Sequence, residues 1–473
     1  MDISPRMWAG VDQRLRPCVP ATRGDMLRWL VCLAMPALAL VAACEKKVEP
    51  FGPDLPPSGH ERVLISAGIR DTYPSMPENI VGMLTNVRRL VGANARCELV
   101  DWMAAPGSGG NAKVVALSRR LVEFCALDTD DLTASIARER LGTKTFRFDI
   151  SGDVLTLLAY STESNVDVCC SMQFPMTRLG DSNFWAARRR IGGADSAMLS
   201  LFVVKDERTR VEEILTFHGS NAPADPPQVA DGELAGKLFD REFTSAAMGE
   251  TRRLKIYLPP GWSKDKSWPA LFLADNSAGV YAPLVEAMIV EGRIRPLVLI
   301  SAQSGERAVV GKAPTAYGGD LRSAEYIRDY AGAGDRFDQH MAFFAVELTK
   351  HAVDEYSVST DREERAVAGF SNGGVFALWA GLLHPDVYAL AIPMSPGMAP
   401  IVAEDLAPGV RASFRFAAGL YEPEFLETAK AAEAVLTQGG YDASGVYLSA
   451  GHEPEQWRVV MHKALLEMFP PAP

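Results

Sequence analysis

The chain has 473 residues, of which 48% are hydrophobic and 23% are charged, an ordinary globular composition with room for about three domains. Its formal net charge of −11 argues against a nucleic-acid partner. The sequence contains no P-loop, no G-x-G-x-x-G after a strand and no H-E-x-x-H motif. We therefore expect neither a cofactor nor a metal.

The first 43 residues have the pattern of a targeting segment. Arg23 and Arg28 form a basic flank, and the apolar run from Trp29 to Ala43 is shorter than the roughly 20 residues that span a bilayer. Small residues precede Cys44, as at a bacterial lipoprotein cleavage site. We expect cleavage after Ala43, lipidation of Cys44, and an exported protein at the outer membrane facing the periplasm. A plain signal peptide with a chance cysteine, or a short anchor, is the alternative.

The next segments differ in composition and in hydrophobic period. Residues 44–59 are charged and proline-rich, which is typical of a tether. Residues 60–142 are mixed, with helical spacing and no assignable function; within them, residues 130–142 begin with Asp and end with Gly, as a capped helix does. Residues 143–220 contain short alternating or β-branched runs, which predict a small β-sandwich. Residues 221–232 have the composition of a linker.

Cysteine usage agrees with export. Besides Cys44, the exported chain would keep Cys97, Cys125, Cys169 and Cys170, and an oxidising compartment permits disulfides among these four. Four cysteines allow three pairings, and the sequence does not choose between them. A structural zinc site is the weaker alternative, because no C-x-x-C pairs or nearby histidines support it.

Residues 233–473 alternate short apolar strands with helical runs. Strands are predicted in the runs TRRLKIYLPPG, PALFLAD, RPLVLISAQ, RAVAGF, YALAIPMSP and FRFAAGL. Such alternation indicates a parallel sheet covered on both faces by helices. The fold class is therefore α/β, and we expect an α/β-hydrolase domain preceded by the β-sandwich module.

The run GFSNGG joins a predicted strand to a predicted helix. Gly369, Gly373 and Gly374 surround Ser371, and so sharp a turn needs residues without a Cβ. This pattern indicates a nucleophile elbow, G-x-S-x-G, which lifts a serine Oγ above the sheet. An ordinary glycine-rich turn with an incidental serine is the alternative.

A serine nucleophile needs a histidine base and a carboxylate, in the chain order Ser, acid, His on this fold. His452 follows a predicted strand end, whereas His462 lies in a helical run. Glu422 follows the strand FRFAAGL and is the favoured acid; Glu424 and then Asp386 are the alternatives. Glu422 is also placed where a carboxylate would simply begin a helix.

Acyl transfer also requires an oxyanion hole. The backbone N–H of Asn372, directly after the nucleophile, is one expected donor. The second is expected in the loop after PALFLAD, at Asn276 or Ser277. These donors would stabilise negative charge that develops in the tetrahedral intermediate.

The runs GFSNGG, AGLYEP and AGHEPEQWRVVMHKAL together resemble the enterochelin-esterase branch of the esterase family that includes esterase D and feruloyl esterases. The resemblance covers about residues 233–469, and a weaker one joins PMTRLGDSNFWAARRR to the N-terminal β-sandwich of enterochelin esterases. It implies an α/β-hydrolase fold and a triad of Ser371, His452 and Glu422. Asp275-Asn276 departs from the Asp-Gly of many relatives, which bears on the second oxyanion donor.

The resulting hypothesis is a serine carboxylic-ester hydrolase that works through an acyl-enzyme. Ferric siderophore esters are one expected substrate class, and Arg188, Arg307 and Arg322 would then grip an acidic substrate, unless they are only solvated surface. The alternatives are an acyltransferase with the same triad, an esterase acting on feruloyl or acetyl groups of polysaccharides, and a non-catalytic surface lipoprotein.

Overall fold

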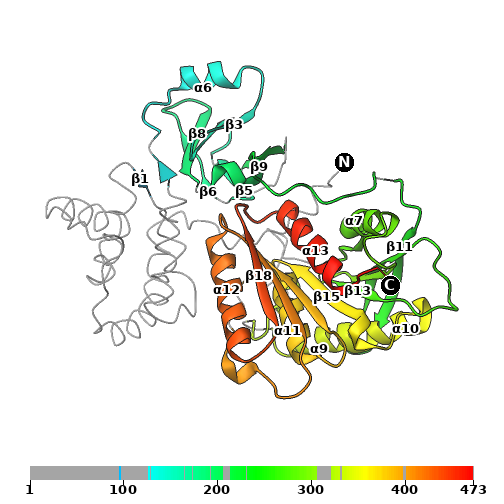
Figure 1. Ribbon diagram of the computed structural model, residues 1–473. Coiled ribbons are helices and arrows are strands. Elements are labelled where there is room, and N and C mark those ends of the chain that lie inside the picture. Colours follow the sequence, from blue (N-terminus) through cyan, green and yellow to red (C-terminus); the bar gives the residue numbers. More distant parts are fainter. Residues whose placement is uncertain are drawn as a thin grey trace, which may run out of the picture. The chain divides into compact units, whose positions relative to one another are not determined.

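The structure is a computed structural model that describes residues 95–96, 126–127, 129–164, 166–172, 174–191, 193–205, 214–230, 232–305, 321–330, 333–397 and 401–471. The chain divides into two compact units between Gly219 and Ser220 (Figure 1). The predicted targeting segment, the predicted tether, Cys44 and Arg307 lie outside the described residues. So do Cys97, Cys125 and the side chains of Cys169 and Cys170.

The N-terminal unit contains two antiparallel sheets. One has the order β1 (Ala95–Arg96), β2 (Ala126–Leu127), β8 (Phe184–Arg190), β4 (Val154–Tyr160) and β3 (Phe146–Ser151), with β7 (Thr177–Arg178) beside β8. The other has the order β10 (Leu215–His218), β9 (Met198–Lys205), β5 (Val166–Cys170) and β6 (Phe174–Pro175). The rings of Phe148 and Phe217 meet edge to face with centroids 6.4 Å apart, which joins β3 of one sheet to β10 of the other.

One helix packs on this unit. In α6 (Ala134–Leu141), the Thr133 hydroxyl accepts the N–H of Ile136 at 3.3 Å, and Gly142 ends the helix at φ +58°. Buried residues of α6 and its N-terminal flank, Leu132, Ala137 and Leu141, pack against Leu158 of β4 and against Phe184 and Ala186 of β8. A helix that the sequence placed ahead of the predicted β-sandwich therefore covers one face of the β4–β8 sheet and forms a hydrophobic cluster with it. A short 3-10 turn, η3 (Ala194–Ser196), precedes β9.

The C-terminal unit is built on an eight-stranded sheet. Its order is β11 (Lys237–Ser245), β12 (Glu250–Leu258), β14 (Val298–Ala302), β13 (Ala270–Leu273), β15 (Arg365–Phe370), β16 (Leu390–Met394), β17 (Ser413–Gly419) and β18 (Ala443–Leu448). The β11–β12 and β12–β14 pairs are antiparallel, and the remaining pairs are parallel. This mostly parallel sheet with flanking helices confirms the predicted α/β-hydrolase fold class.

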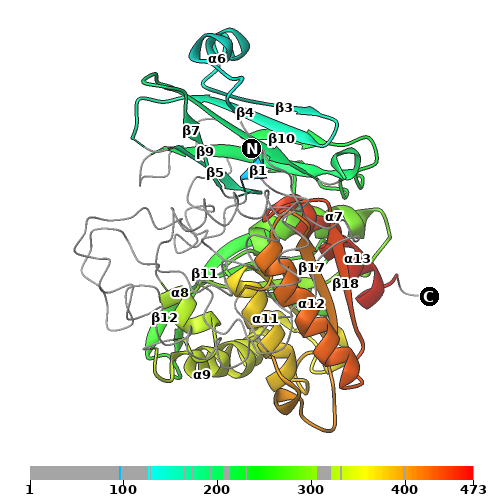
Figure 2. The same ribbon diagram turned by 90° about the vertical axis from the view of Figure 1, so that its left-hand side faces the viewer.

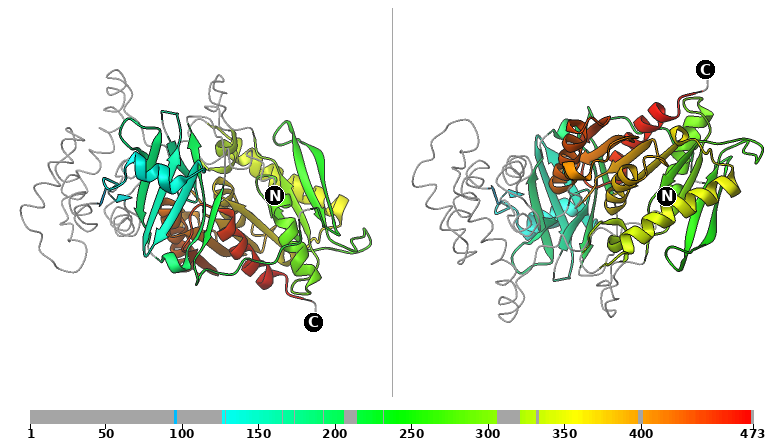
Figure 3. Two further views of the ribbon diagram at one scale, coloured as in Figure 1. Left: turned by 90° about the horizontal axis from the view of Figure 1, so that it is seen from above. Right: turned by 90° about the horizontal axis from the view of Figure 1, so that it is seen from below.

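Helices cover both faces of the sheet (Figures 2 and 3). On one face lie α7 (Ala278–Val290) and α13 (Pro454–Met468). On the other lie α8 (Leu321–Tyr326), α9 (Arg336–Met341), the π-helical η4 (Ala342–Leu348), α10 (Thr349–Tyr356), α11 (Asn372–Leu383) and α12 (Pro423–Gln438). Two 3-10 turns, η5 (Arg362–Glu364) and η6 (Ala403–Asp405), lie in connections.

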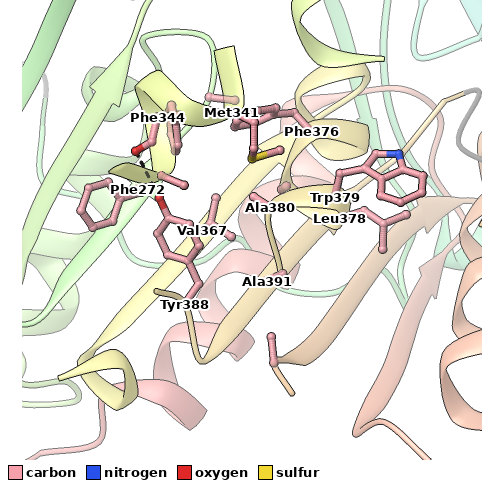
Figure 4. Packing of buried hydrophobic residues seen from close by; sticks show 14 of the residues in the cluster. Phe272, Met341, Phe344, Val367, Phe376, Leu378, Trp379, Ala380, Tyr388 and Ala391 are labelled. Carbon is pink, nitrogen blue, oxygen red and sulfur yellow. Dashed lines mark hydrogen bonds between the residues drawn. The ribbon is translucent and has the colours of Figure 1, made fainter. Parts of the chain in front are cut away.

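Successive residues of the central strands alternate between the two cores. Phe272 of β13 packs with the α11 side, whereas its neighbours Leu271 and Leu273 pack with the α7 and α13 side. Figure 4 shows the first of these cores, where the Phe272 and Tyr388 rings meet edge to face at 5.5 Å. Close packing on both faces makes the sheet a rigid base for the loops at its edges. Among the described helices, none is long and apolar enough to cross a membrane.

Candidate active site

Polar side chains follow neighbouring parallel strands at the same edge of the sheet. Because the carboxyl ends of parallel strands meet at one edge, these side chains are brought together although they are distant in sequence. They follow β13, β15, β16, β17 and β18, respectively: Asp275, Ser371, Ser395, Glu422 and His452.

Ser371 occupies a strained turn between β15 and α11, with φ +58° and ψ −128°. A Cβ on Gly369 would lie 2.1 Å from the carbonyl oxygen of Gly373, and one on Gly374 would lie 2.4 Å from that of Met394. Glycine is thus required on both sides of the serine. The Ser371 N–H donates to the Met394 carbonyl at 2.9 Å, which ties the turn to β16.

Glu422 and His452 form a buried, hydrogen-bonded pair. The Nδ1 atom of His452 lies 2.6 Å from Glu422 Oε2, and both side chains are 3% exposed. The other carboxylate oxygen, Oε1, accepts hydrogen bonds of 2.6 Å from three donors: the Gly419 N–H, the Ser395 hydroxyl and the Gln456 side-chain amide.

These contacts indicate which atom donates within the pair. An ionised carboxylate can only accept hydrogen bonds, and Glu422 Oε1 accepts those of Gly419, Ser395 and Gln456. The Nδ1 atom of His452 must then carry the proton that it donates to Glu422. The Nε2 atom is left with a lone pair, which is the form a general base requires.

Aromatic rings hold the His452 imidazole in place. The Phe425 ring lies against it at 4.2 Å between centroids, and the Trp457 ring meets it edge-on at 5.0 Å. Trp457 in turn stacks on Phe370 at 4.4 Å with an interplanar angle of 15°. Phe370 immediately precedes Ser371, so a continuous set of ring contacts leads from the nucleophile turn to the imidazole.

The alternative acid and base lie elsewhere. Asp386 is exposed and precedes β16, which places it at the opposite edge of the sheet from Ser371. His462 lies eight residues into α13, about 12 Å along the helix from Pro454, and burial lowers its pKa. The side chain of Glu424 lies outside the described residues. The structure thus brings Ser371, Glu422 and His452 to one edge.

The predicted second donor of the oxyanion hole, at Asn276 or Ser277, requires a correction. The N–H of Asn372 lies at the start of α11, and no described residue accepts a hydrogen bond from it. By contrast, the Asn276 N–H donates to the Ala302 carbonyl at 2.9 Å, and the Ser277 N–H donates to that of Ala274 at 3.3 Å. Asn276 has a positive φ of +56°, and the resulting turn directs these two N–H groups to the Ala302 and Ala274 carbonyls. Neither is available as the second donor.

The expectation that Arg188 and Arg322 bind an acidic substrate is also corrected. Arg322 is 3% exposed and forms a bidentate ion pair with Asp275, with Nε–Oδ1 at 2.6 Å and Nη2–Oδ2 at 2.7 Å. Asp275 Oδ2 lies 2.7 Å from where a Cβ would project on Gly373, so the pair supports the nucleophile turn. Arg188 pairs with Asp131 at 2.8 and 3.0 Å within the N-terminal unit. Arg322 and Arg188 are therefore engaged with carboxylates of the protein.

Three site residues were missed in the sequence: Ser395, Gln456 and Trp457. A signal for Ser395 existed, since it directly follows the strand beside the nucleophile strand. Gln456 and Trp457 lie in the first turn of α13, where apolar periodicity hides their polar contacts. Among the described residues, no group of three or more His, Cys, Asp and Glu side chains is arranged to hold a metal ion.

Comparisons with known proteins found a matching family and solved structures of similar fold. Residues 245–472 match the family described as Putative esterase. Enterochelin esterase from Shigella flexneri superposes with a TM-score of 0.51 at 15% identity, over 70% of this chain and 97% of that chain. The enterobactin esterase of Shigella flexneri in the presence of enterobactin gives 0.50 at 14% identity, over 71% and 98%. A ferulic acid esterase from Anaeromyces mucronatus gives 0.43 at 14% identity, over 52% and 95%.

Proposed function

Because residues 245–472 match the family described as Putative esterase, we propose that the chain hydrolyses carboxylic esters through an acyl-enzyme on Ser371. His452 is the general base and Glu422 the acid that orients it. The Asn372 N–H is one oxyanion donor. The observation that carries this proposal is the buried Glu422–His452 pair beside the strained Ser371 turn.

In the acylation step, Ser371 Oγ attacks the ester carbonyl carbon while His452 Nε2 takes the hydroxyl proton. The carbonyl π electrons move to oxygen, and the N–H of Asn372 and the N-terminus of α11 stabilise that negative charge. When the intermediate collapses, the carbon–oxygen bond to the alcohol breaks, and His452 returns the proton to the departing alkoxide.

In the deacylation step, His452 Nε2 takes a proton from water, and the resulting hydroxide equivalent attacks the acyl carbon. Collapse releases the acid and returns the proton to Ser371 Oγ. In both steps His452 becomes an imidazolium next to the Glu422 carboxylate, which stabilises the positive charge. The Nδ1–H to Oε2 contact of 2.6 Å also keeps the imidazole in the productive tautomer.

The substrate class that we propose is an enterobactin-like ester of an aromatic acyl-serine. Structures of enterochelin and enterobactin esterases match 70–71% of this chain and nearly all of their own length. A match of that extent reaches beyond the esterase domain into the β-sheet unit. Feruloyl esters are the alternative substrate class, against which hydrolysis of the enterobactin-like ester is compared.

Labelling with a fluorophosphonate tests the mechanism. We expect one adduct, on Ser371, with no labelling of Ser371→Ala. Hydrolysis is then compared for enterobactin, a methyl ferulate ester and p-nitrophenyl acetate. A folded chain that forms no adduct and cleaves none of these esters would contradict the proposed function. Preference for the ferulate ester would contradict only the proposed substrate class.

We also propose that the protein is exported and anchored by a lipid on Cys44. The basic flank, the short apolar run and the small residues before the cysteine support this. Two or more acyl chains anchor a protein stably, whereas a single chain is marginal. Mass spectrometry of the mature N-terminal peptide should find Cys44 first and lipid-modified; an unmodified peptide that starts elsewhere would contradict it.

A further inference from the structure

The Ser395 hydroxyl connects the orienting acid to a buried indole. Ser395 is completely buried at the carboxyl end of β16, and its Oγ lies 2.6 Å from Glu422 Oε1 and 2.7 Å from Trp457 Nε1. An indole N–H can only donate, so Ser395 Oγ accepts from Trp457. The hydroxyl hydrogen is therefore free to be donated to Glu422.

The backbone at Ser395 is unfavourable for serine. Its φ is +43°, in the left-handed region where glycine is comfortable and other residues pay about 1–3 kcal/mol. The Ser395 N–H donates to the Ala417 carbonyl at 2.7 Å, which fixes this conformation between β16 and β17. Glycine would relieve the strain, yet the chain holds a serine whose hydroxyl reaches the acid.

The donors to Glu422 Oε1 are all uncharged. The Ser395 hydroxyl, the Gly419 N–H and the Gln456 amide orient the carboxylate without cancelling its charge. Oε2 is thereby directed at His452, and the negative charge remains available to the imidazolium. The hydroxyl also accepts hydrogen bonds from Trp457 Nε1 at 2.7 Å and from Gln456 Nε2 at 3.3 Å, which hold it in place.

From this geometry we propose that Ser395 is a positioning residue, which donates its hydroxyl hydrogen to Glu422 and thereby holds the Glu422–His452 pair in the orientation that activates Ser371. The inference rests on the proposed triad. It assigns Ser395 no contact with substrate. Its role is exerted entirely through the acid.

A purely structural role must be distinguished from this one. If Ser395 served only to satisfy the Trp457 indole, its hydroxyl would become dispensable once that N–H is gone. Trp457→Phe removes the N–H and keeps an aromatic ring on Phe370. Ser395→Ala is therefore compared in the natural and in the Trp457→Phe background.

Ser245 offers a matched control. It is 1% exposed, its hydroxyl donates to the Glu347 carboxylate at 2.6 Å, and it accepts the Met248 N–H at 3.0 Å. It ends β11, an edge strand of the sheet, and is remote from the site in strand order. Ser245→Ala thus removes the same type of hydrogen bond without touching the triad.

The experiment measures kcat, KM and the rate of fluorophosphonate labelling for the full chain. We expect Ser395→Ala to lower kcat and the labelling rate about tenfold, as for loss of one hydrogen bond to a charged group, with KM unchanged. The loss should be similar in the Trp457→Phe background and absent in Ser245→Ala. An unchanged kcat, or a loss that disappears with the indole, would overturn the inference.

Different results would contradict the proposed function and the proposed role of Ser395. If Ser371 is never labelled and the natural chain cleaves no ester, the proposed function is wrong. If the natural chain is active and labelled at Ser371, but Ser395→Ala is folded and reacts at the natural rate, only the role of Ser395 is wrong. Circular dichroism spectra of all variants identify any that fail to fold; for Ser395→Ala, Ser395→Gly then replaces it, with the same expected loss.

Discussion

The described residues of the C-terminal unit include two buried pairs of neighbouring Glu and His side chains, which have different surroundings. In the candidate site, His452 Nδ1 lies 2.6 Å from Glu422 and is hydrogen-bonded to it. Near α8, His340 Nδ1 lies 3.5 Å from Glu325 Oε2 without a hydrogen bond, and all four side chains are at most 3% exposed. Burial of a carboxylate beside an imidazole is therefore common to both.

The difference lies in what else reaches the carboxylate. Glu422 meets neutral donors, whereas Glu325 is bonded by the guanidinium groups of Arg252 and Arg336 and by the Gly305 N–H at 2.5 Å. The positive charges of the two arginines compensate the negative charge of the Glu325 carboxylate. Burial, with help from Arg252 and Arg336, lowers the pKa of His340 well below its usual value. His340 stays neutral among aromatic rings and has no hydrogen-bond partner among the described residues.

In the proposed mechanism, two features suit the Glu422–His452 pair to base catalysis: its hydrogen bond and a carboxylate charge that no arginine compensates. A carboxylate already paired with arginines has little attraction left for an imidazolium. The following predictions test that distinction, from the largest effect to the smallest.

Ser371→Ala should lower kcat by several thousandfold or more without unfolding the chain, because removal of a triad nucleophile has effects of that size. Hydrolysis of a p-nitrophenyl ester by the purified variant measures this. A folded Ser371→Ala protein with normal turnover would remove the candidate site from the reaction.

Glu422→Gln should lower kcat by about a hundredfold or more, because the amide cannot accept all of its present donors and favours the wrong His452 tautomer. Glu325→Gln is the matched variant at the other pair. It should lower the free energy of unfolding by about 3 kcal/mol, because two arginines lose their buried partner. Its effect on the kcat of folded protein should be far smaller. If Glu422→Gln and Glu325→Gln lowered kcat equally, the distinction between the two Glu–His pairs would be wrong.

Arg322→Ala should lower the free energy of unfolding by about 3 kcal/mol, because it leaves the Asp275 carboxylate, which is only 12% exposed, without its ion pair at the nucleophile turn. Arg322→Lys should recover only part of this, since lysine cannot form the bidentate pair. Urea unfolding measures both. A stable Arg322→Ala protein whose only defect is a raised KM for anionic esters would restore the substrate-binding role that the geometry removes.

His340→Phe should change the pH dependence of stability. Because the folded pKa of His340 is lowered, the unfolded chain binds a proton that the folded chain does not, and stability falls as pH drops below about 6.5. At pH 5.5 this amounts to about 1.4 kcal/mol. Urea unfolding at pH 7.5 and 5.5 should show a correspondingly smaller loss in the variant. An unchanged difference would mean that His340 is protonated in the fold.

The sequence alone was sufficient for features that depend on local chemistry. The glycines around Ser371, the alternation of apolar strands with helices, and the positions of Glu422 and His452 after strands are all visible as short patterns. The α/β class follows from them because backbone geometry and the burial of one face act over a few residues. The edge at which the side chains gather follows from strand direction.

Only the tertiary structure decided which partner each polar group finds. Arg322 and Asp275 are 47 residues apart, Ser395 and Glu422 are 27 apart, and Ser395 and Trp457 are 62 apart. From the sequence alone, Arg322 is interpreted as a substrate ligand, whereas the structure places the Asp275 carboxylate beside it. Likewise, a turn with positive φ at Asp275 and Asn276 determines where the amides point. Hydrogen bonding depends on position within a few tenths of an ångström, and the packing of distant segments sets that position.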